Sequence, residues 1–275
     1  MVIEMLSLQE KFPVRFVALG LMLCALFLTT SAAAHADHWY CVHAKDHQRP
    51  RADAALDYVR KYDGYYLGED AEDKVIYLTF DAGYENGNVE KILDVLREQQ
   101  VPAAFFILSN LINRNPELVE RMFSEGHTVC NHTAHHKDMS RVTDRAQFAA
   151  ELDALSELCR EKLGHEVAKY YRPPEGNFSE ENMKWAQELG YKTIFWSFAY
   201  ADWDNKKQPD TSAAKEKILS NLHPGEIMLL HPTSATNAAI LGEVIRTCKE
   251  QGYRFGTLEE LTAGVTREDE ETSEK

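Results

Sequence analysis

The stretch VIYLTFDAGYENGNVEKILDVLREQQ (75–100) contains the pattern that decides the fold. Its first six residues form a largely apolar run of strand length, and apolar residues then recur at helical spacing from Val89 to Leu96. A short strand that is apolar on both faces and is followed by an amphipathic helix is typical of a parallel α/β sheet. The stretch therefore predicts one strand–helix unit, with a polar loop between its two elements.

The rest of the chain repeats this unit without internal sequence repeats or low-complexity linkers. The predicted strands are residues 75–80, 103–108, 127–130, 168–171, 193–196, 227–230 and 253–255. The predicted helices are residues 88–100, 116–126, 144–163, 180–189, 211–222, 237–251 and 257–261. Seven such units predict an α/β fold with a closed or nearly closed barrel, a distorted (β/α)7 barrel, and a doubly wound open sheet is the alternative. In both folds the active site lies beyond the C-terminal ends of the strands.

The ends of the chain differ in composition from this central part. Lys11 and Arg15 precede an apolar run over 16–28, and small residues follow up to Ala36. This layout predicts a signal peptide over 1–36 that is cleaved after Ala36, with an uncleaved anchor helix as the alternative. The remaining predicted boundaries are an N-terminal extension over 37–73, a main domain over 74–262 and an acidic flexible tail over 263–275.

Length, charge and cysteine content exclude several classes of protein. The 275 residues suit one large α/β domain or two small ones, and 44% hydrophobic content is too high for a disordered chain. The net charge of −14 argues against nucleic acid as a partner, because phosphate binding needs clustered Lys and Arg. We interpret the four cysteines that follow the leader as buried thiols, with two disulfides as the alternative; they are Cys41, Cys130, Cys159 and Cys248.

Polar clusters follow five of the predicted strands. They are TFDAGYENG (79–87), NHTAHH (131–136), RPPEGNFS (172–179), WSFAYADWD (196–204) and LLHPTS (229–234). Each cluster alone is compatible with ordinary loop chemistry. Because the C-terminal ends of parallel strands meet at one rim, the five together predict an active site there.

Two histidines in the second cluster have the spacing of metal ligands. His132 and His136 are four residues apart, which places two imidazoles on one side of a helical turn, although a solvated loop explains such a pair, taken alone, more often than a metal does. His135 is expected to point elsewhere. Asp81 ends the first strand, and beside two ligand histidines it is interpreted as a general base acting on water, with loop capping as the alternative.

Four residues in the later clusters complete the predicted site. Arg172 precedes two prolines that fix the backbone, so its guanidinium is expected to contact a carboxylate unless it is a surface residue. His231 is predicted to protonate a leaving amine, with a buried structural role as the alternative. Asp202 is predicted to orient that histidine and Trp203 to line a sugar pocket, unless both are simple loop anchors.

The ordered set of clusters resembles the NodB-homology polysaccharide deacetylases, the family-four carbohydrate esterases, over about residues 75–261. The residues that match the five motifs of that family are Thr79, Phe80, Asp81 and Gly83, then His132, Thr133 and His136, then Arg172, Pro173, Pro174 and Gly176, then Asp202 and Trp203, and last Leu229 and His231. The fourth motif departs from the family at Ala199, where an Asp is usual. The resemblance implies that the chain is an N-deacetylase with a distorted barrel fold.

The resemblance also implies a role for each catalytic residue. Asp81 would activate the water and Arg172 would orient Asp81. His231 would protonate the departing amine, and Asp202 would tune His231. The tetrahedral oxyanion would be stabilised by the metal and by nearby backbone N–H groups. Substrate contacts are expected from Tyr84, Asn86, Pro173, Pro174, Trp203 and Leu229.

The metal site departs from the family in one ligand. The resemblance implies that His132 and His136 hold a divalent metal, Zn²⁺ or else Co²⁺ or Mn²⁺, but Ala82 occupies the position of the usual third ligand, an Asp. Water, substrate, Glu85 or Asn86 would have to complete the coordination, and the affinity is expected to be weaker than that of a three-ligand site.

The sequence FDAGYENG (80–87) is similar to the branch of de-N-acetylases that form muramic δ-lactam in the spore cortex. This implies action on N-acetylmuramic acid in peptidoglycan strands, with a cell-wall amidase acting upstream. It also implies export to the cell wall or the intermembrane space of the forespore, and we expect a monomer. The alternatives are an N-acetylglucosamine deacetylase, a wall-binding module without catalysis, and a glycosidase that uses Asp81, Glu175 and Asp202.

Overall fold

The computed structural model describes residues 36–42, 44 and 46–263, all of which belong to the compact unit Ala34–Lys275. The predicted signal peptide and the predicted acidic tail lie outside the described residues, apart from Ala36 and Ala263. Within the described part of the chain, no helix has both the length and the apolar content needed to cross a membrane.

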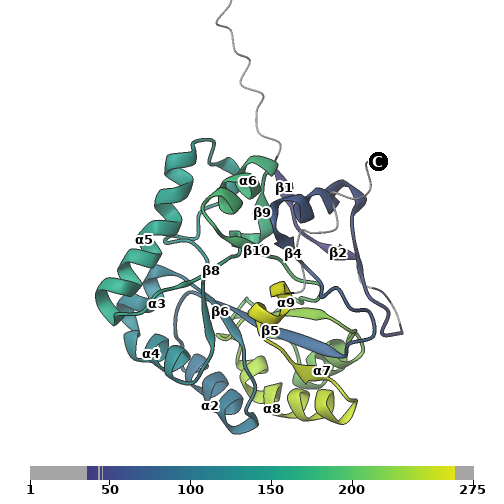
Figure 1. Ribbon diagram of the computed structural model, residues 1–275. Helices are drawn as coiled ribbons and strands as arrows, with labels where there is room; N and C mark the ends of the chain where they lie inside the picture. The colour runs from purple at the N-terminus through teal and green to yellow at the C-terminus, as the bar shows by residue number, and fades with distance from the viewer. Residues whose placement is uncertain (1–35, 43, 45, 264–275) are drawn as a thin grey trace, which may run out of the picture. The chain divides into compact units, whose positions relative to one another are not determined.

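The centre of this unit is a parallel sheet, which Figure 1 shows encircled by helices. Its strands run in the order β11-β5-β6-β7-β8-β10-β4, and β12 pairs with β5. Their bounds are β4 Gly64–Tyr65, β5 Val75–Ala82, β6 Ala104–Ile107, β7 Thr128–Asn131, β8 Ala168–Tyr171, β10 Lys192–Ile194, β11 Glu226–Leu230 and β12 Arg254–Phe255. Each of the seven predicted strands is present, and the predicted distorted barrel is confirmed.

The sheet closes on itself irregularly between its two edge strands. The chain that follows β10 crosses to β11, where Phe198 pairs with Met228 in parallel. Just before β11 begins, the segment that follows β4 is attached to it. The Gly68 N–H donates to the Gly225 carbonyl at 2.8 Å. A Cβ on Gly225, whose φ is +74°, would lie 3.1 Å from the Gly68 backbone, so this close approach requires glycine.

Helices cover the outer face of the strands, except for α9, which packs against the inward-facing residues of β5. Their bounds are α2 Val89–Gln99, α3 Ser109–Arg114, α4 Pro116–Ser124, α5 Arg145–Leu163, α6 Glu180–Glu188, α7 Thr211–Leu219, α8 Ala235–Glu250 and α9 Leu258–Ala263. The sequence pattern did not predict α3, because it begins directly after β6 with no separating turn residue. Leu111 and Ile112 of α3 are fully buried in the core between helices and sheet.

The alternation of side chains along β5 places the functional residues. Ile76, Leu78 and Phe80 face the helical layer and are buried in the large core cluster. The intervening residues face the barrel interior, where Val75 and Tyr77 pack against α9. α9 therefore packs at the end of the barrel where the strands begin. Thr79 and Asp81 follow Tyr77 on the inward face of β5, so they lie toward the other end of the barrel, where the strands finish.

The N-terminal segment contributes to the sheet as well as covering it. It contains β1 Asp37–His38, β2 Cys41–Val42, β3 Arg51–Ala52 and the 3₁₀ helix η3 Ala54–Tyr62, and it ends in β4. β4 pairs in parallel with β10, and β1 pairs antiparallel with the two-residue strand β9 Asn177–Phe178. Strands of two residues produce no periodicity, which is why the sequence predicted only an irregular extension here.

The cysteines carry no disulfide in the described part of the chain. Cys130, Cys159 and Cys248 are buried and Cys41 is partly buried, and all four are free thiols. Burial raises the pKa of Cys248 and of Cys41 to about 12. The interpretation of these residues as thiols is confirmed.

Candidate active site

A cavity of about 600 Å³ lies at the C-terminal ends of the strands. It collects side chains from loops far apart in the sequence, as the barrel fold predicts. Its lining residues are His38, Asp81, Gly83, Tyr84, Leu108, His132, His136, Glu175, Trp196, Ala199, Tyr200, Trp203, Leu229, His231 and Thr233. A volume of this size accommodates a sugar residue with its substituents.

Asp81 is held by a fully buried arginine. Arg172 Nη1 donates to Asp81 Oδ1 at 2.8 Å, and the guanidinium lies 4.1 Å from the centre of the Phe106 ring. Arg172 Nε donates to the Ile194 carbonyl, and Nη2 donates to Thr79 Oγ1 and to the Phe195 carbonyl. Burial alone would raise the pKa of Asp81, but the neighbouring Arg172 guanidinium outweighs burial through its charge and its hydrogen bond and lowers that pKa. Asp81 is therefore an ionised carboxylate with one oxygen, Oδ2, left for chemistry.

His132 and His136 meet face to edge beside Asp81. Their ring centres are 5.0 Å apart, and His132 Nε2 lies 3.6 Å from Asp81 Oδ2. His132 Nδ1 donates to the Arg172 carbonyl at 2.8 Å, which leaves Nε2 as the basic nitrogen. Burial lowers the pKa of His132 to about 4, although Asp81 opposes this, so His132 is a neutral imidazole.

The loop that carries the two histidines has an unusual backbone. Thr133 has a φ of +72° and His136 a φ of +55°, although neither is glycine. The left-handed region is especially costly for a β-branched residue such as Thr133. Thr133 Oγ1 accepts a hydrogen bond from the His136 N–H at 3.0 Å, which holds this conformation. The strain is located where two imidazoles are brought to one side of the loop.

His231 faces Asp81 across the cavity and is held by a buried carboxylate. Asp202, with no exposed surface, accepts from His231 Nδ1 at 2.7 Å, from the His231 N–H at 2.8 Å and from Asn237 Nδ2 at 2.6 Å. Burial lowers the pKa of His231, but the hydrogen bond and charge of Asp202 outweigh this, with help from Asp81, and raise it. His231 is therefore suited to donate a proton, and Asp81 to accept one.

Four predicted site residues have other roles in the structure. Asn86 does not line the cavity, because its side chain donates to the Thr233 carbonyl and accepts from Asn88. Glu85 accepts from backbone N–H groups at the start of α2, including that of Val89 at 3.0 Å. The structure thus corrects the suggestion that either residue completes a metal site.

Pro173 and Pro174 are likewise absent from the cavity wall. Both are buried directly behind Arg172, where they fix the turn that aims its backbone carbonyl at His132. Their predicted contact with substrate stays a prediction, and in the structure the two buried prolines make the backbone next to Arg172 rigid.

The other predicted contact residues lie at the cavity. Leu229 lies in its wall, while Tyr84 and Trp203 are aromatic residues at its mouth, 46% and 59% exposed. Asn205 Nδ2 donates to the Tyr84 hydroxyl at 2.9 Å, which links the loops that carry the two aromatic residues. Trp203 also contacts the His231 ring, at 6.0 Å between centres. Exposed aromatic faces of this kind suit stacking against a sugar ring.

Several cavity residues were not predicted from the sequence. His38, Trp196, Tyr200 and Thr233 line the cavity, and so does Glu175, which was considered only for a glycosidase. Trp196, Tyr200 and Thr233 lie within polar clusters that the sequence does show at strand ends. His38 has no such signal, because it belongs to the N-terminal segment and reaches the cavity only through pairing of β1 with β9.

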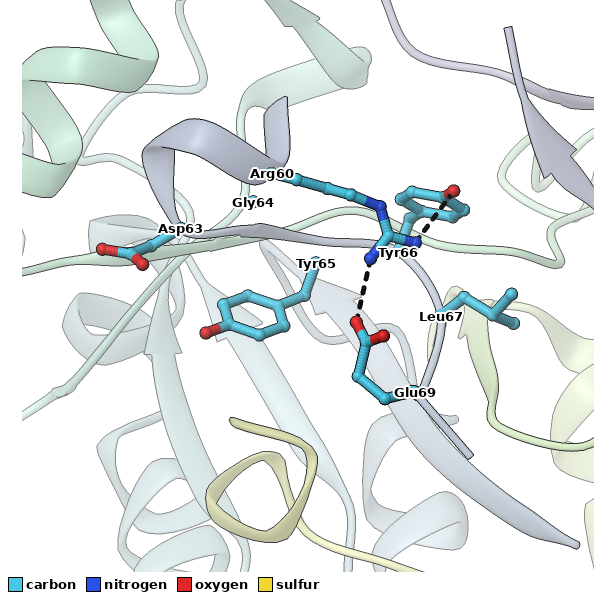
Figure 2. A pocket seen from close by; sticks show the side chains of 7 residues that line it. All are labelled: Arg60, Asp63, Gly64, Tyr65, Tyr66, Leu67 and Glu69. Atoms are coloured by element: carbon cyan, nitrogen blue, oxygen red, sulfur yellow. Dashed lines mark hydrogen bonds and ion pairs between the residues drawn. The ribbon is translucent and has the colours of Figure 1, made fainter. Parts of the chain in front are cut away.

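A second, much smaller cavity of about 60 Å³ lies against β4, away from the catalytic groups. Figure 2 shows its lining, in which Arg60 bonds to Glu69 and to the Tyr66 hydroxyl. Arg60 and Glu69 are bonded to each other, Asp63 accepts from Gln187 Nε2 at 2.9 Å, and the volume holds only a few waters. It has no features of an active site.

The donor set for a metal is limited to two imidazoles. Among residues 36–42, 44 and 46–263, no group of three or more His, Cys, Asp or Glu side chains is arranged to hold a metal ion. Ala82, at the position of the expected third ligand, is fully buried in the core cluster that faces the helices. The neutral His132 and its neighbour His136 still fit an ion that takes nitrogen ligands and completes its coordination with water or substrate.

Comparison with known proteins agrees with this geometry. The family described as Polysaccharide deacetylase matches residues 68–194. The peptidoglycan-N-acetylmuramic acid deacetylase PdaA of Bacillus subtilis is 39% identical over 246 residues, which cover 86% of this chain and 93% of that protein. A peptidoglycan-N-acetylglucosamine deacetylase of Bacillus cereus is 32% identical over 69% of this chain and 88% of its own length. The structure of B. subtilis PdaA, a family 4 carbohydrate esterase, is similar with a TM-score of 0.79 and 39% identity over 82% of this chain and 97% of that one.

Proposed function

The chain belongs to the polysaccharide deacetylase family, and from this premise we propose that it hydrolyses the N-acetyl group of N-acetylmuramic acid in peptidoglycan. The observation that carries the proposal is the pairing of an ionised Asp81 and a proton-donating His231 in one cavity. The muramic acid assignment is supported by the match to a named muramic acid deacetylase over most of both chains.

The acid–base chemistry follows from the two anchored side chains. Asp81 Oδ2 accepts a proton from the attacking water, while Arg172 holds the other carboxylate oxygen in place. His231 carries its Nδ1 proton toward Asp202, so its other nitrogen, Nε2, donates the proton to the departing amine. The C–N bond of the acetamide breaks, and the products are acetate and a free amine.

A divalent metal fits the two histidines, and we propose that His132 and His136 hold it. When bound, Zn²⁺, Co²⁺ or Mn²⁺ would supply a Lewis acid for the acetyl oxygen. A metal ligand must be a neutral imidazole with a fixed orientation. Burial keeps His132 neutral, and its hydrogen bond to the Arg172 carbonyl fixes the ring.

The walls of the cavity suit a glycan strand. Trp203 and Tyr84 present exposed aromatic faces at the mouth, and Leu229 supplies an apolar wall beside His231. Sugar rings stack on aromatic faces through their C–H groups, so the two residues are proposed to hold the rings on either side of the reacting sugar.

Deacetylation of N-acetylmuramic acid leads to a product that N-acetylglucosamine cannot form, a lactam. Muramic acid carries a lactyl group on O3, next to the carbon that bears the acetamide. Once the amine is free it can attack the lactyl carboxyl, forming an amide bond and releasing water, and a six-membered lactam closes by proximity. Closure requires a lactyl carboxyl free of peptide, so an amidase is proposed to act upstream on the strand.

The proposed setting is outside the cytoplasm. The predicted leader over 1–36 would export the chain to the cell wall or to the intermembrane space of the forespore. The cortex of the spore, where muramic δ-lactam is the product, is the proposed site of action.

The decisive experiment uses defined, peptide-free glycan strands of alternating N-acetylglucosamine and N-acetylmuramic acid. Mass spectrometry is expected to show loss of acetyl from muramic acid and then loss of water, with N-acetylglucosamine unchanged. Loss of acetyl from N-acetylglucosamine alone would contradict the muramic acid assignment. It would favour the second candidate, an N-acetylglucosamine deacetylase, which the match with the B. cereus enzyme supports.

A further inference from the structure

One histidine of the cavity has no part in the mechanism. His38 lines the same cavity as Asp81 and His231, but it comes from the N-terminal segment. In the described cavity wall the side chains able to carry a positive charge are four histidines, and the other three already have catalytic or metal-binding roles. His38 is therefore the basic side chain left to contact an anionic part of the substrate.

The position of His38 is fixed by its neighbours on both sides. β1 pairs with β9, which places His38 opposite Asn177. The next residue, Trp39, is buried, stacks on Phe195 at 4.5 Å between ring centres and donates to the Trp196 carbonyl at 2.9 Å. Trp39 thus anchors the strand, and His38 is held at the cavity rather than carried on a loose terminus.

The orientation of the His38 ring is set by a short polar chain. Asn177 Nδ2 donates to Glu175 Oε2 at 3.2 Å, so Asn177 Oδ1 is directed to His38 and accepts from Nδ1 at 2.8 Å. Glu175 has a φ of +56°, a costly conformation that directs this turn. Within the described residues His38 Nε2 has no hydrogen-bond partner, which leaves it for a ligand.

The two candidate sugars differ only at O3. N-acetylmuramic acid carries a lactyl carboxylate there and N-acetylglucosamine a hydroxyl. O3 is bonded to the carbon next to the one that bears the acetamide, so the group that distinguishes the sugars must lie in the same cavity as the catalytic residues. A protonated imidazole is a suitable donor to a carboxylate, and the bond between them is charge-assisted.

The comparisons agree with a role for the N-terminal segment. The family match begins at residue 68, after the segment that carries His38. The match with the muramic acid deacetylase covers 86% of the chain, so it must include part of 37–67.

We propose that His38 recognises the 3-O-lactyl carboxylate of N-acetylmuramic acid through Nε2, and that Asn177 and Glu175 position it. The proposal rests on the proposed function and adds the residue that selects muramic acid. His38 contributes to binding and selection, while Asp81 and His231 carry out the proton transfers.

The test compares kcat/KM for acetate release from three peptide-free oligosaccharides. The first contains N-acetylmuramic acid, the second is the same glycan with its lactyl carboxyl converted to the neutral amide, and the third is a chitooligosaccharide. In His38→Ala the preference for the muramic acid glycan over the chitooligosaccharide is expected to fall about 10- to 100-fold, the effect of losing one charged hydrogen bond. The loss is expected mainly in KM, and the preference of carboxylate over amide should disappear.

Two further variants make the result specific. Asn177→Ala should reduce the same preference less strongly, because it releases the ring without removing it. His165→Ala is the matched control, since His165 bonds to Glu120 away from the cavity, and its preference should equal that of the wild type. Melting temperatures would confirm that the variants fold.

The outcomes separate this proposal from the proposed function. If the wild type deacetylates muramic acid and His38→Ala keeps the wild-type preference, the role of His38 is wrong while the proposed function stands. If the wild type releases acetate only from the chitooligosaccharide, the proposed function fails and the role of His38 fails with it.

Discussion

The hydrogen bond between Asp202 and His231 should control how the rate of acetate release depends on pH. Asp202→Asn removes a buried negative charge without changing the size of the side chain. Asp202 raises the pKa of His231, whereas burial of the ring lowers it. Without the carboxylate the effect of burial dominates, so the pKa of His231 is expected to fall. His231 then loses the proton that it donates to the departing amine at a lower pH.

The size of the effect follows from the geometry. The 2.7 Å bond between His231 Nδ1 and Asp202 Oδ1 is charge-assisted when the imidazole is protonated. Such bonds contribute about 1.5–3 kcal/mol, and about 1.4 kcal/mol corresponds to one pKa unit. We therefore expect the alkaline limb of the kcat/KM profile to move about 1–2 pH units lower in Asp202→Asn. At pH 8 the loss of activity should be about 10- to 100-fold.

The assay is acetate release across pH 5–9, with Asp204→Asn as the matched control. Asp204 lies on the same loop, but it is exposed and accepts from the Lys206 N–H instead of a catalytic group. Its profile should match the wild type. An Asp202→Asn enzyme whose alkaline limb stays in place at near-normal turnover would show that His231 is not the proton donor, or that Asp202 does not control it.

Three more predictions follow from the same structure. Asp81→Asn should reduce acetate release at least about 100-fold and lower the melting temperature, because the charge of buried Arg172 loses its partner; an active variant would mean that another group is the base. A chelator should remove activity that Zn²⁺, Co²⁺ or Mn²⁺ restores, and His136→Ala should lose both activity and metal by elemental analysis; full activity in metal-free protein would contradict this. Burial raises the pKa of Glu226 well above its usual value, so the stability of the native state falls as pH rises above about 4.5. Glu226→Gln should therefore raise the melting temperature at pH 7.5 and give little gain near pH 4.5, and equal effects at both would refute the assignment.

The parts of the fold that the sequence predicted are those with a strong local signal. β5 is a largely apolar run and α2 has regular apolar spacing, so both elements are visible in the sequence itself. The site at the strand ends followed from topology. Asp81, Arg172 and His231 were predicted because parallel strands bring their ends together whatever the distance in sequence.

The residues that escaped prediction depend on tertiary contacts. β4 is two residues long and is a strand only because β10 lies beside it. His38 reaches the cavity because Trp39 fills a space against Phe195 that no local pattern reveals. Asn86 and Glu85 were assigned to the site from their place in a polar loop, but Asn86 bonds to the Thr233 carbonyl before α8, and Glu85 bonds to backbone N–H groups at the start of α2. A polar cluster in the sequence thus indicates where a site lies. Which of its side chains point into the site can be determined only from the structure.

The substitution at Ala82 has a consequence for how the enzyme would hold its metal. Neighbouring residues of a strand point to opposite faces, and Ala82 lies in the core that faces the helices, while Asp81 faces the interior. Since Glu85 and Asn86 bond elsewhere, the nearest carboxylate to His132 is Asp81, whose Oδ2 lies 3.6 Å from His132 Nε2. Arg172 occupies the other oxygen of Asp81. Among the residues that the structure describes, Asp81 and the two histidines do not form a three-ligand metal group, so the protein donors for an ion are the two imidazoles. We expect the metal to be held weakly and activity to follow the free metal concentration.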